Sequence, residues 1–484
     1  MYLGLDLGTS GVKALLLDAG LAPVGSAHAP LGISRPQPGW SEQDPADWIR
    51  TATTAIEALA RAHPGPMARL GAIGLSGQMH GAVLLDGGDR VLRPCILWND
   101  GRAGAECHAL EARADFRGIA GNLVMAGFTA PKLAWLARHE PQVFAATARV
   151  LLPKDYLRLW LTGEHVSDMS DAAGTLWLDV ARRDWSDTLL AATGLSRAQM
   201  PALVEGSAVS GRLRADLAAR WGVARVPVAG GAGDNAATAC GMGVMAPGTG
   251  FLSLGTSGVL FAATDRHAPN TAEAVHAFCH AVPGRWHQMG VILSASDSMV
   301  WLSEISGRQV PELATMVAEG APVPAPVTFL PYLSGERTPL NDPDACGAFL
   351  GLRRGVGLAD LARAVMEGVA MGFADCAQAL ARAGTRLDAA WATGGGAASR
   401  AWLSIIASAS GITLLEPEGE APGAALGAAR LAAACVSGDL SARTFAPPRI
   451  SAEIAPDPAL AARYAERHAA YRAAWPALRG LARR

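Results

Sequence analysis

A short recurrence is the feature that most constrains the fold of this chain. Gly8-Thr9-Ser10-Gly11 in the first half returns as Gly255-Thr256-Ser257-Gly258 in the second half, and an apolar run ending in leucine precedes each copy. Apolar runs on both sides of a glycine-rich turn predict two β-strands joined tightly. One recurrence at this spacing is not the period of a solenoid. It predicts two similar domains, each with one hydroxyl-rich turn.

The length and the pattern of apolar runs support this division. At 484 residues the chain is long enough for two domains or three, and the second half begins near Gly248. Glycine-bounded strand-like runs alternate with helical stretches, which predicts an α/β fold. The predicted strands cover residues 2–6, 11–18, 24–30, 71–76, 83–86, 226–230, 251–254, 259–262 and 390–393. The predicted helices cover residues 45–62 after the cap Asp44, 154–162, a segment capped by Asp360, and 400–410 after the cap Ser399.

Bulk properties exclude several classes of protein. A net charge of -2 gives no basic surface for nucleic acid. The seven cysteines are odd in number and scattered, which predicts buried reduced thiols. Residues 235–264 carry no charge, but their many glycines and Pro247 are unlike a membrane span. No signal-like segment opens the chain, so we expect a cytoplasmic protein that does not bind a membrane.

Lysine occurs at only three positions, Lys13, Lys132 and Lys154. None of them follows a glycine, so the chain has no Walker A motif and is not a P-loop kinase. We interpret the scarcity of lysine as codon bias in a chain rich in alanine, arginine and glycine.

The first hydroxyl-rich turn is a candidate phosphate site. Its glycines allow a tight turn in which backbone N–H groups and the hydroxyls of Thr9 and Ser10 converge on an anion. Lys13 could reach the same anion, and Asp6 at the strand end could hold Mg²⁺ directly or through water. An ordinary β-hairpin with locally satisfied side chains is the alternative. The second copy favours the phosphate site, because two opposed turns could clamp a nucleotide.

Three further segments carry candidate site residues. Asp234 is a lone carboxylate in Gly231-Ala232-Gly233-Asp234-Asn235, where it could act as a base, cap the helix that follows, or do both. Residues 78–80 (Gln-Met-His) end a strand and could line a small-molecule pocket with Trp98, although a lone histidine is usually structural. Residues 394–396, three glycines, would let a flat ring approach closely, or they form a plain strand-to-helix turn.

These segments together resemble a known family. DLGTSGVK, SGQMHG, LWND, AGDNAATA, SLGTSG and GGGA occur here in the order found in the FGGY carbohydrate kinases, and ALGAARLA near the end is also similar. The resemblance covers nearly the whole chain. It implies two ribonuclease H-like (actin-like ATPase) domains with an interdomain cleft. The N-terminal domain, residues 1–245, would bind the sugar, and the C-terminal domain, residues 246–484, would bind the nucleotide.

The resemblance also implies a reaction. ATP with Mg²⁺ would phosphorylate the 5-hydroxyl of D-xylulose in pentose catabolism. Ribulose, gluconate, glycerol or fuculose remain open as other acceptors, and a non-catalytic actin-like nucleotide switch is an alternative of a different class. The family allows a homodimer, whereas the sequence itself does not give the oligomeric state.

By position, the family's functional residues fall on the segments described above. At Ala398-Ser399-Arg400 the chain departs from the family, which often has Lys or Ser followed by Asn or Gln after the glycines. The departure bears on the adenine side of the site. The implied roles are Asp234 as catalytic base, Asp6 as a second catalytic residue near the metal, Met79 and His80 as substrate-binding residues with Asn235 also at the sugar, Thr9, Ser10, Lys13 and the facing Thr256 at the phosphates, and Gly394, Gly395 and Gly396 at the nucleoside.

Overall fold

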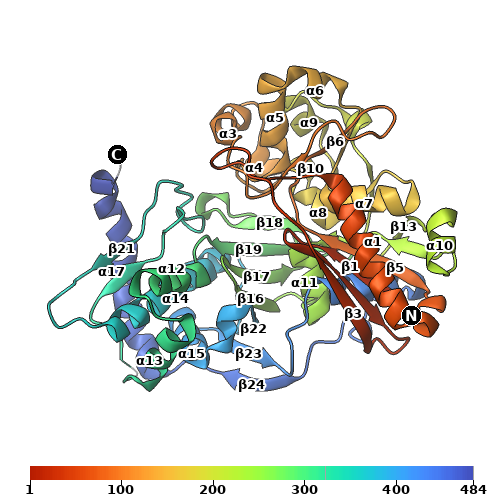
Figure 1. Ribbon diagram of the computed structural model, residues 1–484. Helices are drawn as coiled ribbons and strands as arrows, with labels where there is room; N and C mark the ends of the chain where they lie inside the picture. Colours follow the sequence, from red (N-terminus) through yellow and green to blue (C-terminus); the bar gives the residue numbers. More distant parts are fainter. Residues whose placement is uncertain (322, 483–484) are drawn as a thin grey trace.

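The computed structural model describes residues 1–321 and 323–482, and two seven-stranded sheets form its framework (Figure 1). The first sheet has the order β13-β14-β5-β1-β2-β3, with β15 paired to β5. The second has the order β18-β19-β17-β16-β22-β23-β24.

The strands of the first sheet come from two separate parts of the N-terminal region, residues 2–77 and 209–233. Three antiparallel strands come first, and β1 then continues into parallel neighbours β5 and, beyond it, β14. Its strands are β1 (Tyr2–Leu7), β2 (Gly11–Leu17), β3 (Pro23–Pro30), β5 (Ala72–Gly77), β13 (Val209–Arg212), β14 (Pro227–Ala229) and β15 (Ala232–Gly233).

The second sheet repeats this pattern. An antiparallel hairpin, β16 and β17, pairs with β19 on one side and with the parallel strands β22 and β23 on the other. Its strands are β16 (Gly250–Leu254), β17 (Gly258–Thr264), β18 (His276–Cys279), β19 (Trp286–Ile292), β22 (Ala389–Thr393), β23 (Thr413–Pro417) and β24 (Ile450–Ile454). The recurrent turns occupy equivalent places, between β1 and β2 and between β16 and β17. The predicted pair of ribonuclease H-like, actin-like domains is therefore confirmed.

A large insertion between β5 and β13 separates the halves of the first sheet. Figure 1 shows helices α3 to α6 and α9 gathered in a lobe of their own. The other elements of the N-terminal half are β4 (Glu42–Gln43), α1 (Pro45–Ala62), α2 (Pro64–Ala68), β6 (Val83–Leu85), β7 (Cys95–Ile96), α3 (Gly104–Glu111), α4 (Phe116–Ile119), α5 (Thr129–His139), α6 (Pro141–Ala146), β8 (Arg149–Leu151), α7 (Pro153–Thr162), β9 (Val166–Asp168), α8 (Met169–Ala173), β10 (Leu178–Asp179), β11 (Asp184–Trp185), α9 (Asp187–Ala192), β12 (Ala202–Val204), α10 (Ala215–Trp221) and α11 (Asp234–Met242).

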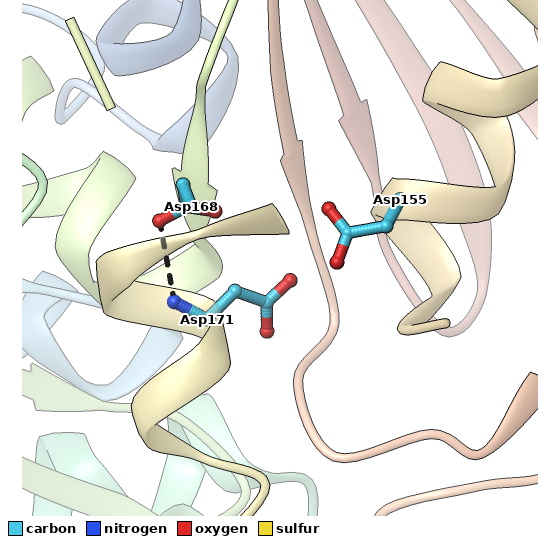
Figure 2. A group of neighbouring side chains, drawn as sticks. All are labelled: Asp155, Asp168 and Asp171. Carbon is cyan, nitrogen blue, oxygen red and sulfur yellow. Dashed lines mark hydrogen bonds between the residues drawn. The ribbon is translucent and has the colours of Figure 1, made fainter. Parts of the chain in front are cut away.

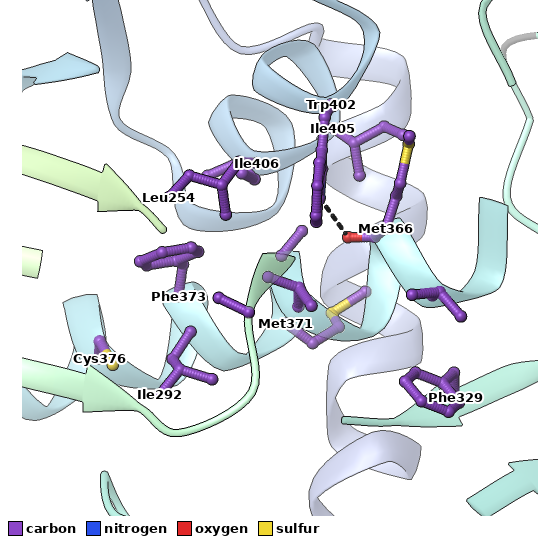
Figure 3. Close-up of a cluster of buried hydrophobic side chains, with 14 of the residues drawn as sticks. Leu254, Ile292, Phe329, Met366, Met371, Phe373, Cys376, Trp402, Ile405 and Ile406 are labelled. Carbon is purple, nitrogen blue, oxygen red and sulfur yellow. Dashed lines mark hydrogen bonds between the residues drawn. The ribbon is translucent and has the colours of Figure 1, made fainter. Parts of the chain in front are cut away.

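The core of the second half lies between its sheet and the helices α14 and α15. Figure 3 shows Phe373 of α14 beside Leu254 and Ile292 of the sheet, and Trp402 of α15 donates its indole N–H to the carbonyl of Met366 at 3.1 Å. The remaining elements here are α12 (Ser296–Ser306), α13 (Val310–Glu319), β20 (Thr328–Leu330), β21 (Ala348–Leu350), α14 (Leu358–Arg382), α15 (Arg400–Ser410), α16 (Ala424–Ser437) and α17 (Pro458–Ala482), and short 3₁₀ turns span Arg197–Gln199, Thr271–Glu273 and Gly395–Ala398.

One helix of the C-terminal half packs on the N-terminal sheet. A Cβ at Gly4 of β1 would lie 2.1 Å from the carbonyl oxygen of Ala425 in α16, and one at Gly74 of β5 would lie 1.8 Å from that of Ala428. Glycine at these positions is what lets α16 approach the sheet so closely. The two halves are therefore joined by direct backbone contact as well as by the chain connection.

Most predicted elements occur where expected. Asp44 caps α1, Gly163 ends α7 with a positive φ of 83°, and Ser399 caps α15. Two expectations are wrong. The helix assigned to an Asp360 cap begins at Leu358, and the Asp360 carboxylate instead accepts the N–H of Gly357 at 2.9 Å. Cys346 is exposed because it lies in the loop between β20 and β21. Among the described residues, no helix is long and apolar enough to cross a bilayer.

Candidate active site

Asp234 lies where the first sheet ends and helix α11 begins. Strand β15 pairs with β5 so that Gly233 stands opposite Gly77, which places Asp234 beside the 77–80 segment. The helix begins at Asp234 itself, with Gly233 as its N-cap, so the expected capping role is wrong. The carboxylate Oδ1 instead accepts two bonds from Asn235, from the backbone N–H at 2.7 Å and from the side-chain amide at 3.0 Å. Oδ2 is left for another partner.

The electrostatic setting of Asp234 suits a base. Burial raises the pKa of Asp234 to about 6, and the nearby charge of Asp6 adds to the shift against the two bonds from Asn235. A carboxylate with a pKa near 6 is ionised at neutral pH but is a stronger proton acceptor than an ordinary one. The two aspartates that the sequence indicates are thus close enough to influence each other.

Asp6 lies on β1, opposite Lys13 of β2 and Ser76 of β5. Burial raises the pKa of Asp6, and Ser76 and Lys13 oppose that shift. Its Oδ1 is buried and has no hydrogen-bond partner among the described residues. An unsatisfied carboxylate oxygen beside a second carboxylate is a suitable ligand for a hard divalent cation.

Met79 packs directly against the Asp234 segment. A Cβ at Gly233 would lie 2.8 Å from Met79 Cγ, and one at Gly174 would lie 2.8 Å from Met79 Cε. The thioether is buried between these glycines. The structure therefore brings together the residues predicted for the sugar and for the base.

The ring of His80 is fixed by a single short hydrogen bond. Its Nδ1 lies 2.7 Å from the carbonyl oxygen of Gly174, and because a carbonyl only accepts, Nδ1 carries the proton. Burial lowers the pKa of His80 to about 3, so the ring is neutral. Nε2 is then a hydrogen-bond acceptor, which suits a sugar hydroxyl. Phe128 packs edge-on against the ring, with the two centroids 4.6 Å apart.

The first turn is tied to the same segment by side-chain hydrogen bonds. The Thr9 hydroxyl donates to Gln78 Oε1 and accepts from the indole N–H of Trp98, both at 3.0 Å. Ser10 is exposed, and Lys13 Nζ lies 3.7 Å from Glu420, a residue of the C-terminal half. Trp98 thus contacts the turn as well as offering an exposed aromatic face. The Thr9 hydroxyl is already engaged, so backbone N–H groups, Ser10 and Lys13 are the donors that remain for a phosphate.

The second turn lies against the glycine run. A Cβ at Gly394 would lie 2.6 Å from the backbone of Leu254, and one at Gly396 would lie 2.5 Å from the Leu254 side chain. Gly394 has a φ of 91°, which glycine adopts without strain. Thr256, in the second turn, is exposed. The predicted nucleoside glycines and the second phosphate turn are therefore neighbours.

A cleft of about 430 Å³ opens beside Gly395 and Gly396. Apolar side chains from α12, α13 and α15 line much of it, together with Ser399 and Arg400. The divergent Ser399 caps α15, and Arg400 pairs with Glu416 at 2.8 Å. The unusual residues after the glycines thus have structural partners and still border a cleft suited to a flat apolar ring.

Figure 2 shows a second group of carboxylates, Asp155, Asp168 and Asp171, which are buried and close together. Their spacing would suit a metal ion, but Lys154 Nζ lies 2.9 Å from Asp168 and 3.4 Å from Asp171 and also contacts Asp155. The ammonium group already supplies the positive charge. This buried cluster reaches the active site through Ser170, whose hydroxyl donates to Asp168 and accepts the N–H of Gly233 at 3.1 Å.

The sequence interpretation missed this supporting layer. It includes Lys154 and Ser170 near Asp234, and Lys132, which donates to the carbonyl of His80 at 2.8 Å. One signal could have found two of them, because all three lysines of the chain lie at the candidate site. Lys13 stands opposite Asp6, and a Cβ at Gly77 would lie 3.0 Å from Lys154 Cβ. Codon bias alone does not explain that placement.

Comparison with known proteins identifies the family. Residues 1–241 match the N-terminal domain of the FGGY family of carbohydrate kinases, and residues 250–435 match its C-terminal domain. The chain belongs to the FGGY family of carbohydrate kinases. It is 52% identical over 434 residues to a xylulose kinase of Escherichia coli (strain K12), a match that covers 89% of each protein.

Solved FGGY structures share the whole architecture. A xyloylose kinase from Brucella ovis is 56% identical with a TM-score of 0.97, and the match covers 99% of each chain. A xylulose kinase from Rhodospirillum rubrum is 31% identical with a TM-score of 0.93 over the full length of both. The match extends through both sheets and the C-terminal helix. The predicted family is therefore confirmed.

Proposed function

We propose that this FGGY kinase transfers the γ-phosphoryl group of ATP to the 5-hydroxyl of D-xylulose, giving D-xylulose 5-phosphate and ADP. The observation that carries the proposal is the packing of Met79 on Gly233, which joins a sugar-type pocket to the carboxylate of Asp234. Relatives that are similar over most of their length are named for xylulose, which supports that acceptor.

In this mechanism Asp234 is the general base. Its Oδ2 accepts the proton of the 5-hydroxyl while the sugar oxygen attacks the γ-phosphorus in line. The bond to the oxygen between the β- and γ-phosphorus atoms breaks, and ADP leaves with that electron pair. The elevated pKa of Asp234 suits proton acceptance, and the bonds from Asn235 hold the carboxylate in place. The neutral His80 accepts a hydrogen bond from another sugar hydroxyl through Nε2.

The phosphate chain would lie between the two recurrent turns. Ser10, Lys13 and the backbone of the first turn would face it from one side, and Thr256 from the other. Gly394, Gly395 and Gly396 would border the nucleoside. Asp6 would hold Mg²⁺, since its Oδ1 is buried without a protein partner. The cation would offset charge on the phosphates. This arrangement divides the chain into a sugar domain, residues 1–245, and a nucleotide domain, residues 246–484.

An ADP-release assay over a panel of sugars tests the function. D-xylulose should give the highest kcat/KM among xylulose, ribulose, gluconate, glycerol and fuculose. A better acceptor elsewhere in the panel would reassign the substrate and keep the chemistry. ATP hydrolysis that no sugar accelerates would instead indicate a nucleotide switch and contradict the proposal.

A further inference from the structure

His80 has a backbone conformation that is unusual for its residue type. Its φ is 69°, in the left-handed region that residues with a Cβ rarely adopt. Such a conformation persists where the surroundings hold it, and it is concentrated at functional sites. The next peptide closes a tight turn, in which the N–H of Gly81 donates to the carbonyl of Met79 at 2.9 Å.

A buried ammonium group holds this turn from behind. Lys132 Nζ donates to the carbonyl of His80 and to the carbonyl of Gly127, both at 2.8 Å. Lys132 belongs to α5 and is fully buried. The Thr129 hydroxyl, one turn earlier on α5, donates to the same His80 carbonyl at 3.2 Å. Two donors from one helix therefore meet a single backbone oxygen.

The charge of Lys132 is not explained by an ion pair. Lys154, the other buried lysine, lies among three carboxylates, whereas Lys132 has neutral carbonyls as its hydrogen-bond acceptors. Burial lowers the pKa of Lys132 to about 7, with partial compensation from Cys95 and Asp100. A buried cation without a carboxylate partner is destabilising. What the group contributes here is its pair of hydrogen bonds to the carbonyls of His80 and Gly127.

We propose that Lys132 is a positioning residue for sugar binding, whose ammonium group fixes the His80 carbonyl and thereby holds the His80 ring in its substrate-binding orientation. The ring is then secured at two points, since Gly174 accepts from Nδ1 and Lys132 holds the backbone. The Nε2 atom of His80 is thereby held in one orientation toward the sugar site. The inference rests on the proposed role of His80 at the sugar.

The requirement is for lysine in particular. The chain has 41 basic residues, only three of them lysine. A guanidinium group is larger and planar, and its donors spread as a fork, whereas a compact ammonium group can place two N–H bonds on neighbouring carbonyls in a closed space. Lys132→Arg is therefore expected to fail as a replacement despite keeping the charge.

Steady-state kinetics of Lys132→Met tests the proposal. We expect the KM for the sugar to rise on the order of tenfold, as for the loss of one hydrogen bond to a charged group. The kcat and the KM for ATP should stay within about twofold, because neither the base nor the phosphate turns are touched. Thr147→Val is the matched control. It removes a hydroxyl that donates to the carbonyl of Val143 at 2.8 Å and not to His80, and its KM should be unchanged.

A double-mutant cycle separates positioning from general stability. If Lys132 acts through His80, adding Lys132→Met to His80→Ala should change the sugar KM by less than about twofold. Additive losses, or an unchanged KM in folded Lys132→Met, would overturn the proposal. Should Lys132→Met fail to fold, Thr129→Val decides, because it removes the second donor to the same carbonyl. A KM rise of roughly two- to fivefold supports the proposal, and no rise overturns it.

The assays use whichever sugar the wild-type protein phosphorylates best. A preferred sugar other than D-xylulose would therefore contradict the proposed function and still leave Lys132 testable. An unchanged KM in the variants alongside wild-type activity on D-xylulose would contradict only the role of Lys132.

Discussion

The two recurrent hairpins have the same turn but different surroundings. In the first, Asp6 and Lys13 flank the turn on opposite strands, while Ser253 and Leu260 occupy the equivalent places in the second. Charge is therefore confined to one copy. The second copy instead adjoins the glycine run, through the packing of Gly394 on Leu254.

This difference indicates how one fold serves two tasks. Burial raises the pKa of Asp234, and the charge of Asp6 in the first hairpin adds to that shift. In the proposed mechanism the first hairpin therefore belongs to the reacting end of the site. The uncharged hairpin presents an exposed Thr256 and backbone next to an apolar cleft, which suits nucleotide binding. Variants that change one hairpin and leave the other intact test this contrast.

The largest effect should come from Asp234→Asn, which removes the proposed base from the charged side. We expect kcat to fall by ~10²–10⁴ because the amide cannot accept the hydroxyl proton. Folding and ATP binding should be nearly intact, since Asn keeps the size of the side chain and the second sheet is untouched. Single-turnover kinetics with a thermal unfolding control measures both. Turnover near the wild-type value would contradict the assignment of the base.

Replacing Asp6, two positions before the first turn, should have the next largest effect. Asp6→Ser gives the first copy the residue of the second. We expect kcat to fall on the order of 10²-fold, because the carboxylate proposed to hold Mg²⁺ is lost. Ser253→Ala is the matched change in the uncharged copy, and its kcat should stay within about twofold. Equal losses from both variants would mean that the hairpins share the catalytic role.

The pH dependence of kcat should report the titration of Asp234, beside the first hairpin. Asp234 accepts a proton only as the carboxylate, and its pKa of about 6 means that it becomes protonated as the pH falls through 6. We therefore expect kcat, measured at saturating sugar so that a change in KM from Lys132 does not enter, to drop about tenfold per pH unit below 6 and to level off above it. A pH–rate profile in buffers of constant ionic strength measures this. A limb near pH 4, where an ordinary aspartate titrates, would contradict the buried setting.

The sequence predicted the recurrent hairpins well because their signals are local. Each strand and turn is specified by neighbouring residues, and the equivalence of the two copies followed from four matching positions. Asp234 was found for a similar reason, since a lone carboxylate in an uncharged stretch is visible in the sequence. Its capping role was wrong by one residue because Gly233 already holds the N-cap position.

The contacts of the supporting residues could not be predicted, because their partners are distant in sequence. Lys132 bonds to a carbonyl 52 residues away, and Ser170 accepts an N–H from a residue 63 positions later. In the sequence Lys132 is an ordinary polar residue of an amphipathic helix. Only the packing of α5 beneath the 77–81 turn shows that its ammonium group is buried.

The smallest expected effect is a difference in the free energy of unfolding between variants of the two turn threonines, Thr9 and Thr256. Thr9 makes two hydrogen bonds, to Gln78 and from Trp98, whereas Thr256 is exposed. Thr9→Val should lower the free energy of unfolding by about 1–2 kcal/mol, because two polar partners lose their bonds. Thr256→Val should change it by less than about 0.5 kcal/mol and should instead weaken ATP binding. Urea unfolding and ATP titration distinguish the two. Equal stability changes would show that the first turn is no more firmly anchored to its surroundings than the second.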